Sequence, residues 1–268
     1  MSRVVLVTGA CGGIGRALSK RFADAGDTVL ALDRDAAGVA ALASELASEC
    51  AGRPGAAPIG PIEPVAADVC DAAALDDALA RATAARGPVD VVVANAGGAL
   101  GTTLAHTDAA AWRRDVELNL NGTYHTIEAV RASMIERRRG VLVLIGSVNG
   151  LTALGHPAYS AAKAGLVSYT KALALELGQY GIRANIVCPG TVRTPAWQAR
   201  VARRPDLFEQ LKKWYPLGDV ATPDDIADAV QFLASPMARV ITGVALPVDA
   251  GLMAGNRLMA NELTLDPL

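Results

Sequence analysis

The stretch Val4-Val5-Leu6-Val7-Thr8-Gly9-Ala10-Cys11-Gly12-Gly13-Ile14-Gly15 decides the fold of this chain. It starts as an apolar β-rich run, passes through four glycines and continues into a segment with helical spacing. Glycines at such a turn let the backbone approach a pyrophosphate, whose charge is received by amides at a helix N-terminus. A tight turn without a ligand would also use glycines, but the strand–turn–helix context predicts a nucleotide site. Its residues would be Gly9, Cys11, Gly12, Gly13, Ile14 and Gly15.

The residues that follow this turn narrow the kind of nucleotide. The phosphate-binding loop of NTPases ends in Gly-Lys-Ser/Thr, whereas Gly15 is followed here by Arg16 and Ala17, which excludes that loop. Eighteen residues after Gly15, the second β-rich run ends in Asp33-Arg34. A carboxylate there can accept hydrogen bonds from both ribose hydroxyls of adenosine and repels a 2′-phosphate, which favours NAD. Arg34 could pair with a phosphate and keeps NADP open, and Asp33 has helix capping as an alternative role.

Short β-rich runs alternate with helical segments along the whole chain. The β-rich runs are Val4–Thr8, Thr28–Asp33, Pro64–Ala67, Val89–Ala94, Val141–Ser147, Ile182–Cys188 and Val244–Asp249. The helical segments include Gly13–Ala25, Ala36–Ser48, Ala72–Arg86, Ala110–Arg137, Ala158–Gln179 and Asp224–Ala234. Such alternation implies parallel strands joined by right-handed crossovers. We predict an α/β fold, a Rossmann-like doubly wound parallel sheet of about seven strands with helices on both faces, and a surface loop at Ala51–Pro64.

Length and composition set outer limits on the function. The 268 residues suit one α/β domain, residues 1–268, and 51% apolar with only 4% aromatic residues suits a core of aliphatic side chains. A net charge of −2 and the lack of a basic stripe argue against a nucleic-acid partner. The cluster Arg137-Arg138-Arg139 fits a solvated helix end.

The four cysteines are scattered, at Cys11, Cys50, Cys70 and Cys188, and have no metal-ligand or disulfide-framework spacing. We therefore expect no metal site and a reducing compartment. The chain begins directly with a strand, and no run of about 18 apolar residues occurs. The expected location is cytoplasmic, with no membrane partner.

Tyr159 and Lys163 stand four residues apart in a predicted helix, so an ammonium group lies near a phenol. A free phenol has a pKa near ~10, and a proton donor that works near neutral pH needs this value lowered by roughly three units. One cation about 4 Å away in a medium of moderate dielectric supplies an effect of that size. Amphipathic helices also carry such pairs without function, so the pair gains its meaning from the glycine turn upstream.

Motifs along nearly the whole length resemble those of the short-chain dehydrogenase/reductase family. The matching pieces are Thr8-Gly9-x-x-x-Gly13-x-Gly15, Asp68-Val69, Asn95-Ala96-Gly97, Asn119, Ser147, Tyr159-x-x-x-Lys163, Pro189-Gly190-x-x-x-Thr194, Ile241-Thr-Gly243 and Val248-Asp249. Several motifs in one order are far more specific than any one of them.

The resemblance implies a role for each matching residue. Tyr159 would be the general acid or base, Lys163 would lower its pKa and hold the nicotinamide ribose, and Ser147 would hydrogen-bond the reacting oxygen. Asn119 would anchor a water that belongs to a proton relay. Further cofactor contacts would come from Asp33, Arg34, Asp68, Val69, Asn95, Ala96, Gly97, Tyr159, Lys163, Pro189, Gly190, Val192 and Thr194. Taken singly, Ser147 could cap a strand, Asn119 could be a polar helix residue and Thr194 a turn hydroxyl.

Substrate choice should depend on the loop after Pro189, about residues 190–222, which carries Arg193, Trp197, Arg200 and Trp214-Tyr215. Asn149, His156 and Trp197 could join Ser147 in facing a small polar hydroxyl compound such as a sugar, polyol or hydroxy acid. His156 could equally be a plain loop residue, and the Trp side chains could only pack the loop.

The chain also departs from the family pattern in three places. Only 12 positions separate Ser147 from Tyr159, Ala94 and Gly146 replace frequent Asn and Ser, and Ala250-Gly251 replaces a double glycine. None of these departures removes a chemical group, but they alter loops near the substrate.

Three functions stay open at this point. The first is an NAD-dependent oxidoreductase that interconverts a secondary alcohol and a ketone. The second is a 3-oxoacyl-thioester (acyl carrier protein) reductase, against which Asp33 argues because such relatives usually use NADPH. The third is a non-catalytic NAD-binding sensor, which would have no need of Asn119, Ser147, Tyr159 and Lys163. Small residues on the Tyr159 helix, together with the family habit, suggest a homotetramer, with a dimer as the alternative.

Overall fold

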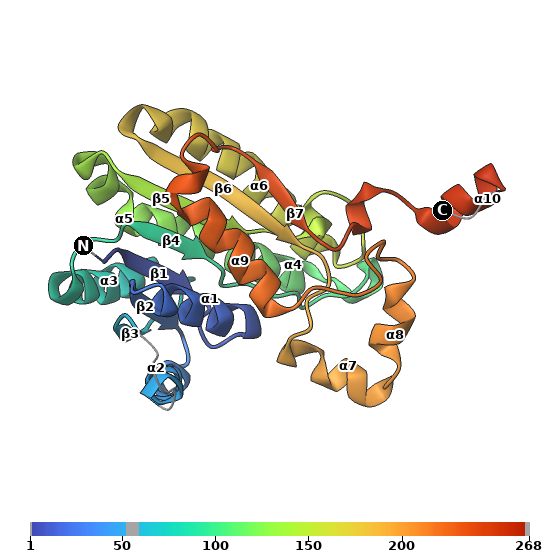
Figure 1. The fold of residues 1–268 in the computed structure, drawn as a ribbon, viewed down its shortest axis with the longest axis horizontal. Coiled ribbons are helices and arrows are strands. Elements are labelled where there is room, and N and C mark those ends of the chain that lie inside the picture. The colour runs from blue at the N-terminus through green and yellow to red at the C-terminus, as the bar shows by residue number, and fades with distance from the viewer. Residues whose placement is uncertain (1, 52–58, 266–268) are drawn as a thin grey trace.

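A computed structural model describes residues 2–51 and 59–265, except for the side chains of residues 50 and 51. Its sheet contains seven parallel strands in the order β3-β2-β1-β4-β5-β6-β7 (Figure 1). The strands are β1 (Val4–Thr8), β2 (Thr28–Asp33), β3 (Ile62–Ala66), β4 (Val91–Ala94), β5 (Gly140–Ile145), β6 (Ile182–Pro189) and β7 (Ala245–Val248). This arrangement confirms the predicted fold class. No helix within the described ranges is long and apolar enough to cross a bilayer.

In the described part of the chain, ten α-helices connect or follow these strands. They are α1 (Gly13–Asp24), α2 (Ala36–Ala51), α3 (Ala72–Arg86), α4 (Ala109–Val116), α5 (Gly122–Arg137), α6 (Pro157–Leu177), α7 (Gln198–Arg203), α8 (Leu207–Lys212), α9 (Pro223–Ala234) and α10 (Arg257–Thr264). In Figure 1, α7 and α8 hang below the ends of the strands, and α10 projects from the body.

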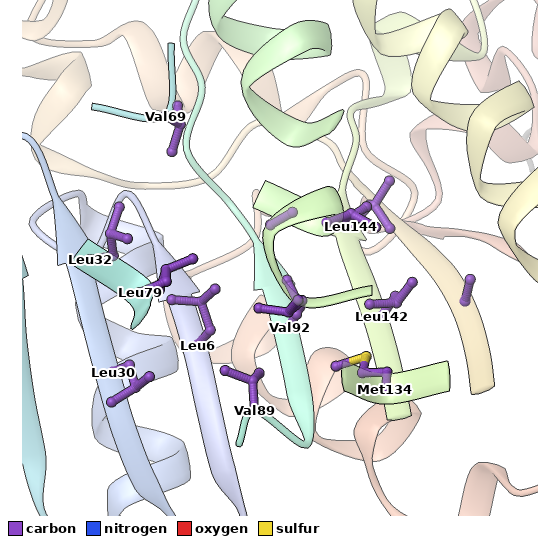
Figure 2. Packing of buried hydrophobic residues seen from close by; sticks show 14 of the residues in the cluster. Leu6, Leu30, Leu32, Val69, Leu79, Val89, Val92, Met134, Leu142 and Leu144 are labelled. Atoms are coloured by element: carbon purple, nitrogen blue, oxygen red, sulfur yellow. The ribbon is translucent and has the colours of Figure 1, made fainter. Parts of the chain in front are cut away.

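Side chains alternate between two apolar layers, one on each face of the sheet. Leu6 of β1 packs with residues of α3, α5 and α6, whereas Val5 and Val7 pack with residues of α1, α2 and α9. Figure 2 shows Leu6, Leu30 and Leu142 among the residues of the first layer. Because both faces of the sheet are covered by helices, the strand sequences consist largely of continuous runs of Val, Leu, Ile and Ala.

The strand order of the sheet reverses at β1, although all strands are parallel. Strands β2 and β3 extend to one side of β1, while β4 pairs with its other side, with Val5 opposite Val91. The crevice at such a switch point, beyond the carboxyl ends of the strands, is where doubly wound sheets bind ligands.

The structure corrects the prediction of one long helix at Ala110–Arg137. This segment is α4 and α5 joined by a wider π-helical stretch, η2 (Glu117–Asn121), that contains Asn119. The side-chain amide of Asn119 donates to the carbonyl oxygens of Asp115 (2.9 Å) and Gly98 (2.7 Å). A widened turn within an α-helix often marks a functional position, and a periodicity of hydrophobic residues does not reveal it.

The predicted loop Ala51–Pro64 is only partly described. Its residues 52–58 lie outside the described residues, and β3 begins inside its last part, at Ile62. Pro64 is tolerated in β3 because β3 is the edge strand of the sheet.

Candidate active site

A cavity of about 1040 Å³ lies beyond the carboxyl ends of the strands. The sequence-predicted residues that line it come from both halves of the chain. They are Gly9, Gly12, Gly13, Ile14, Gly15, Asp33, Arg34, Asp68, Val69, Asn95, Ala96, Gly97, Ser147, Asn149, His156, Tyr159, Lys163, Pro189, Gly190, Val192, Thr194 and Trp197. Of the predicted set, Cys11 and Asn119 are not part of its wall.

The glycine turn is held tightly by backbone contacts. Gly9 has a left-handed φ of +65°, and a Cβ atom there would lie 2.9 Å from Cα of Ala96. A Cβ atom at Gly15 would lie only 2.0 Å from the carbonyl oxygen of Gly9. The side-chain amide of Asn95 donates to the carbonyl oxygens of Thr8 (2.9 Å) and Gly9 (3.1 Å). Asn95 therefore fixes the turn after β1 to the end of β4.

Asp33 lies at the end of β2 with its carboxylate fixed by two backbone amides. Oδ2 accepts from the amide of Cys11 (3.1 Å), and Oδ1 accepts from the amide of Asp35 (3.2 Å). Cys11 thus supports Asp33 through its backbone, although its own side chain lies outside the cavity wall. Desolvation, followed by the charges of Asp33 and Asp35, raises the pKa of the Cys11 thiol to about 11.

Tyr159, Lys163 and Ser147 meet where β5 ends and α6 begins. Lys163 is buried, and its ammonium group donates to the carbonyl oxygen of Ile145 at 2.8 Å. The same nitrogen lies 5.6 Å from the centroid of the Tyr159 ring. Ser147 lies just beyond β5, where its hydroxyl accepts from the amide of Asn149 at 3.1 Å and is close enough to the phenol of Tyr159 to lower its pKa. The helical spacing of Tyr159 and Lys163 thus places phenol and ammonium beside each other, with the serine hydroxyl next to the phenol.

The prediction that the pKa of Tyr159 is lowered is wrong when only the groups of the protein act on the phenol. Burial raises the pKa of the phenol, the hydrogen bond with Ser147 lowers it, and the neighbouring Cys188 and Asp115 raise it further. Burial also lowers the pKa of Lys163 to about 8. Desolvation therefore outweighs the attraction on which the prediction relied.

Asn119 lies behind the cavity wall rather than in it. It is fully buried, and its Oδ1 accepts from the amide of Gly98 (3.0 Å) while its Nδ2 donates to the carbonyl of Gly98. One turn earlier, Oδ1 of the buried Asp115 accepts from the amide of Leu100 at 3.1 Å. A Cβ atom at Gly97 would lie 2.7 Å from Oδ1 of Asn119 and 3.2 Å from Nζ of Lys163. The loop after β4 therefore separates Asn119 from the cavity and adjoins Lys163.

His156 and Asn149 line the cavity but already have partners within the chain. Nδ1 of His156 lies 2.8 Å from the carbonyl oxygen of Gly101, so this nitrogen is assigned the proton. His156 also has a left-handed φ of 52° just before α6. The side-chain amide of Asn149 donates to the carbonyl of Gly155 and to Oγ of Ser160, both at 3.1 Å. These residues shape the loops around Tyr159 more than they offer free groups to a substrate.

The sequence did not predict several other residues of the cavity wall as site residues. They include Gly98, Ala99, Leu118, Gly146, Leu154, Thr191, Ala199, Leu211 and Leu252. Most are small or apolar and carry no chemical signal of their own. Gly146, where relatives often have Ser, packs closely, because a Cβ atom there would lie 2.8 Å from Cδ1 of Ile186. Tyr215 is buried, and its hydroxyl donates to Oγ1 of Thr191 at 2.7 Å, which joins the residues before α9 to those just after β6.

Comparisons with known proteins agree with this geometry. A family model described as enoyl-(acyl carrier protein) reductase matches residues 9–253. An uncharacterized oxidoreductase of Schizosaccharomyces pombe is 42% identical over 265 residues, which cover 97% of this chain and 95% of that protein. Galactitol 2-dehydrogenase (L-tagatose-forming) of Cereibacter sphaeroides is 36% identical over 249 residues, which cover 91% and 92% of the two chains.

Two solved structures share the whole fold. A short-chain dehydrogenase/reductase family oxidoreductase from Burkholderia thailandensis has a TM-score of 0.90 and 59% identity, with coverage of 99% of this chain and 98% of that chain. A 3-oxoacyl-[acyl-carrier protein] reductase with bound NAD from Brucella melitensis has a TM-score of 0.83 and 34% identity, with coverage of 93% and 90%.

Proposed function

The chain belongs to the short-chain dehydrogenase/reductase family, and from this premise we propose that it transfers a hydride between NAD(H) and a secondary alcohol or its ketone. Its similarity to relatives named as alcohol dehydrogenases shows that it is an oxidoreductase that acts on CH–OH groups. One observation supports the more specific proposal of NAD(H) and a secondary alcohol. A single cavity joins a glycine turn and a fixed carboxylate, Asp33, to the phenol of Tyr159. A polyol, sugar or hydroxy acid would place its hydroxyl carbon at the Tyr159 end.

The residues present fit a dinucleotide. The turn Gly9–Gly15 offers backbone amides at the start of α1, where a pyrophosphate is stabilised, and side chains larger than hydrogen would collide there. Asp68 and Val69 line the cavity near Asp33, as expected for an adenine pocket, and Pro189, Gly190, Val192 and Thr194 line it beyond β6. When bound, the nicotinamide supplies the hydride acceptor or donor.

Tyr159 is the proposed general acid and base. In alcohol oxidation its ionised hydroxyl takes the proton of the substrate hydroxyl, and in ketone reduction its protonated form gives that proton back. Ser147 donates a hydrogen bond toward the same oxygen and stabilises the charge that builds on it. Lys163, anchored on the carbonyl of Ile145, keeps a cation beside the phenol and offers donors to the nicotinamide ribose. Asn119 holds the loop at Gly98, next to Lys163.

We propose NAD as the preferred cofactor. The Asp33 carboxylate is held by two amides and cannot turn away, so it would repel a 2′-phosphate placed near it. Arg34 also lines the cavity and is the group that would bind such a phosphate. The carboxylate, being fixed, is expected to dominate.

A direct experiment tests this function. A panel of polyols, cyclic alcohols and hydroxy acids is incubated with NAD⁺ or NADP⁺, and the absorbance of the reduced cofactor is followed. We expect turnover with NAD⁺, and in Tyr159→Phe a loss of about 10²- to 10⁴-fold in kcat while the Kd for NADH stays within about two-fold. Unchanged turnover in Tyr159→Phe would refute the proposed role.

A second candidate is reduction of a 3-oxoacyl thioester. The matching family model and the Brucella melitensis reductase favour it through their names. Acetoacetyl thioesters of coenzyme A and of acyl carrier protein, tested with NADH and NADPH, separate the two functions. A thioester rate above every alcohol rate would support the second candidate and displace the first. If neither a thioester nor an alcohol reacts although NADH binds, the non-catalytic sensor becomes the better interpretation.

We also propose a homotetramer, with a dimer as the alternative. Trp112, Tyr124 and Leu175 on α4, α5 and α6 are exposed apolar side chains that a second subunit could cover. Gly165 is partly used within the chain, since a Cβ atom there would lie 3.4 Å from Leu120. Gel filtration with light scattering should give the mass of four chains, and a monomer would refute the proposal.

The proposed location is cytoplasmic. Cys11, Cys70 and Cys188 are free thiols, as a reducing compartment would keep them. Desolvation raises the pKa of each to about 11, so they stay protonated and unreactive near neutral pH. Fractionation of cells that express the tagged full chain tests the location.

A further inference from the structure

The two ends of the cavity differ in the charges of their walls. The acidic side chains in the wall are Asp33, at the end of β2, and Asp68, which follows β3, and Arg34 lines the wall beside Asp33. The segment of residues 190–222, called here the substrate loop, follows β6, on the other side of β1 from β2 and β3, and contributes Arg200 to the wall. Lys163, the other cation near this end, already donates to Ile145. Among the residues that the structure describes, Arg200 is therefore the charged group of the wall at this end whose side chain has no hydrogen-bond or ion-pair partner.

Arg200 is held in place by a stack of aromatic and cationic side chains. Its guanidinium carbon lies 4.7 Å from the centroid of the Trp197 ring. Trp197 packs against Phe208 with ring centroids 5.9 Å apart, and the guanidinium of Arg193 lies 4.4 Å from the Phe208 centroid. The stack thus joins α8 to the segment before α7 and has an arginine at each end.

The two arginines of this stack differ in their partners. Arg193 forms an ion pair with Asp219 at 2.8 Å and does not line the cavity. Arg200 lines the cavity, and no acidic side chain pairs with it within residues 2–51 and 59–265. The substrate loop as a whole carries six Lys or Arg residues and three Asp or Glu residues, although the chain has a net charge of −2. The substrate loop is therefore positively charged as a whole, and Arg200 is the basic residue that it contributes to the wall of this cavity.

We propose that Arg200 binds an oxyanion of the substrate, so that the substrate is a secondary alcohol or ketone that also carries a carboxylate or a similar anionic group. This inference rests on the proposed function and narrows its substrate class. A planar guanidinium binds a carboxylate through two parallel hydrogen bonds, and its face can remain stacked on Trp197 while its edge does so. Such an anchor would orient the hydroxyl carbon toward Tyr159.

A binding experiment tests the anion site without turnover. Butanoate, propanesulfonate and the neutral butanamide are titrated into the NADH-loaded protein, and tryptophan fluorescence is followed, since Trp197 lies under Arg200. We expect the anions to bind at least about ten-fold more tightly than the amide. The comparison of butanoate with propanesulfonate tells a carboxylate site from a general oxyanion site.

Variants assign the effect to one side chain. Arg200→Ala should reduce the affinity for butanoate to that for butanamide, and Arg200→Lys should restore part of it, with NADH affinity unchanged in both. Arg203→Ala is the matched control, because Arg203 is an exposed arginine of the same short helix that does not line the cavity. Equal binding of anion and amide by the wild type, or equal losses in the Arg200 and Arg203 variants, would overturn the proposal.

A turnover experiment separates this inference from the proposed function. Hydroxy acids of increasing chain length are compared with their methyl esters as substrates for NAD⁺ reduction. We expect the acids to have at least about ten-fold higher kcat/KM than their esters in the wild type, and Arg200→Ala to remove this preference mainly through KM. Better turnover of the esters would overturn the anion site and leave the oxidoreductase intact. If neither series reacts while NADH binds, the proposed function fails, and with it this inference.

Discussion

The nucleotide end and the substrate end of the cavity are built in different ways. At the nucleotide end, the turn at Gly9 and the carboxylate of Asp33 are fixed by backbone hydrogen bonds and close contacts. At the substrate end, α7 and α8 have no buried residue and rely on aromatic and cationic stacking. A glycine turn and a carboxylate that are held by several contacts, the proposed cofactor site, are thus joined to a loop. The surface residues of this loop can change without disturbing those contacts.

After Tyr159→Phe, removal of the Ser147 hydroxyl should give the largest effect, because Ser147 lies next to Tyr159 in the cavity wall. Ser147→Ala is expected to lower kcat about 10²- to 10³-fold, as for other lost donors to a developing oxyanion, with NADH affinity nearly unchanged. Steady-state rates together with NADH fluorescence titration measure both. Ser147→Thr keeps the hydroxyl and should retain more activity than Ser147→Ala. A loss of NADH affinity equal to the loss of kcat would place Ser147 in the proposed cofactor site instead.

The same variant should change the pH dependence of alcohol oxidation. In the proposed mechanism, oxidation needs ionised Tyr159, so its rate should rise with pH through the pKa of the phenol. The hydrogen bond with Ser147 lowers this pKa, and burial raises it. Its removal should therefore move the rising limb of the pH–rate profile to higher pH. An unchanged or acid-shifted limb would contradict the assigned hydrogen bond.

A methyl group at Gly15 should disturb the nucleotide end alone. Its Cβ atom would lie 2.0 Å from the Gly9 carbonyl oxygen, so the turn must open. We expect Gly15→Ala to weaken NADH binding about 10- to 100-fold, from an overpacking cost of roughly 1–3 kcal/mol. Gly178→Ala is the control, because Gly178 is helical and has no atom within 4 Å of its Cβ position. Isothermal calorimetry on both variants decides, and wild-type NADH affinity in Gly15→Ala would contradict the tight turn.

Neutralisation of Asp33 should shift the cofactor preference. Asp33→Asn keeps an acceptor for the Cys11 amide but removes the charge that would repel a 2′-phosphate. The ratio of kcat/KM for NADPH to that for NADH should rise about ten-fold, equal to about 1.4 kcal/mol. Asp35→Asn, two residues further along the chain and outside the cavity wall, should leave the ratio unchanged. An equal rise in both variants would show a diffuse charge effect rather than a contact.

The smallest effect should come from the substrate loop. Arg193→Ala removes an exposed ion pair with Asp219, for which we expect a change of at most about 1 kcal/mol in stability. KM for the alcohol should rise by a few-fold through looser packing of Phe208, while the Kd for NADH stays constant. A change in NADH affinity as large as that in KM would mean that the two ends are coupled.

The sequence predicted the elements around the glycine turn well because their signals are local. The bounds of β1, β2 and α3 agree with the prediction, since each has a strong pattern closed by Gly, Asp or Arg. The two short helices of the substrate loop and α10 were missed, because none of them buries a residue and so none shows an apolar stripe. The contact of Arg193 with Phe208 also depends on where α8 packs, which no spacing along the chain reveals.

The most instructive error concerns Tyr159 and Lys163. Their spacing correctly predicts proximity, but the pKa of each group also depends on how much water the fold removes. Burial lowers the pKa of Lys163 to about 8 and raises that of Tyr159, opposite to the expected acidification. Desolvation depends on the whole fold, so it could not be read from two positions in a helix.

The pKa of the Tyr159 phenol itself tests the central claim most directly. In this account the chain positions the phenol, the serine hydroxyl and the ammonium, and the positive charge of bound NAD⁺ then favours the phenolate. Ultraviolet difference titration of wild type against Tyr159→Phe gives this pKa with and without NAD⁺. We predict a pKa above the ordinary value for the protein alone and a fall of at least about one unit with NAD⁺ bound. A pKa that is unchanged or higher in the NAD⁺ complex would contradict the account.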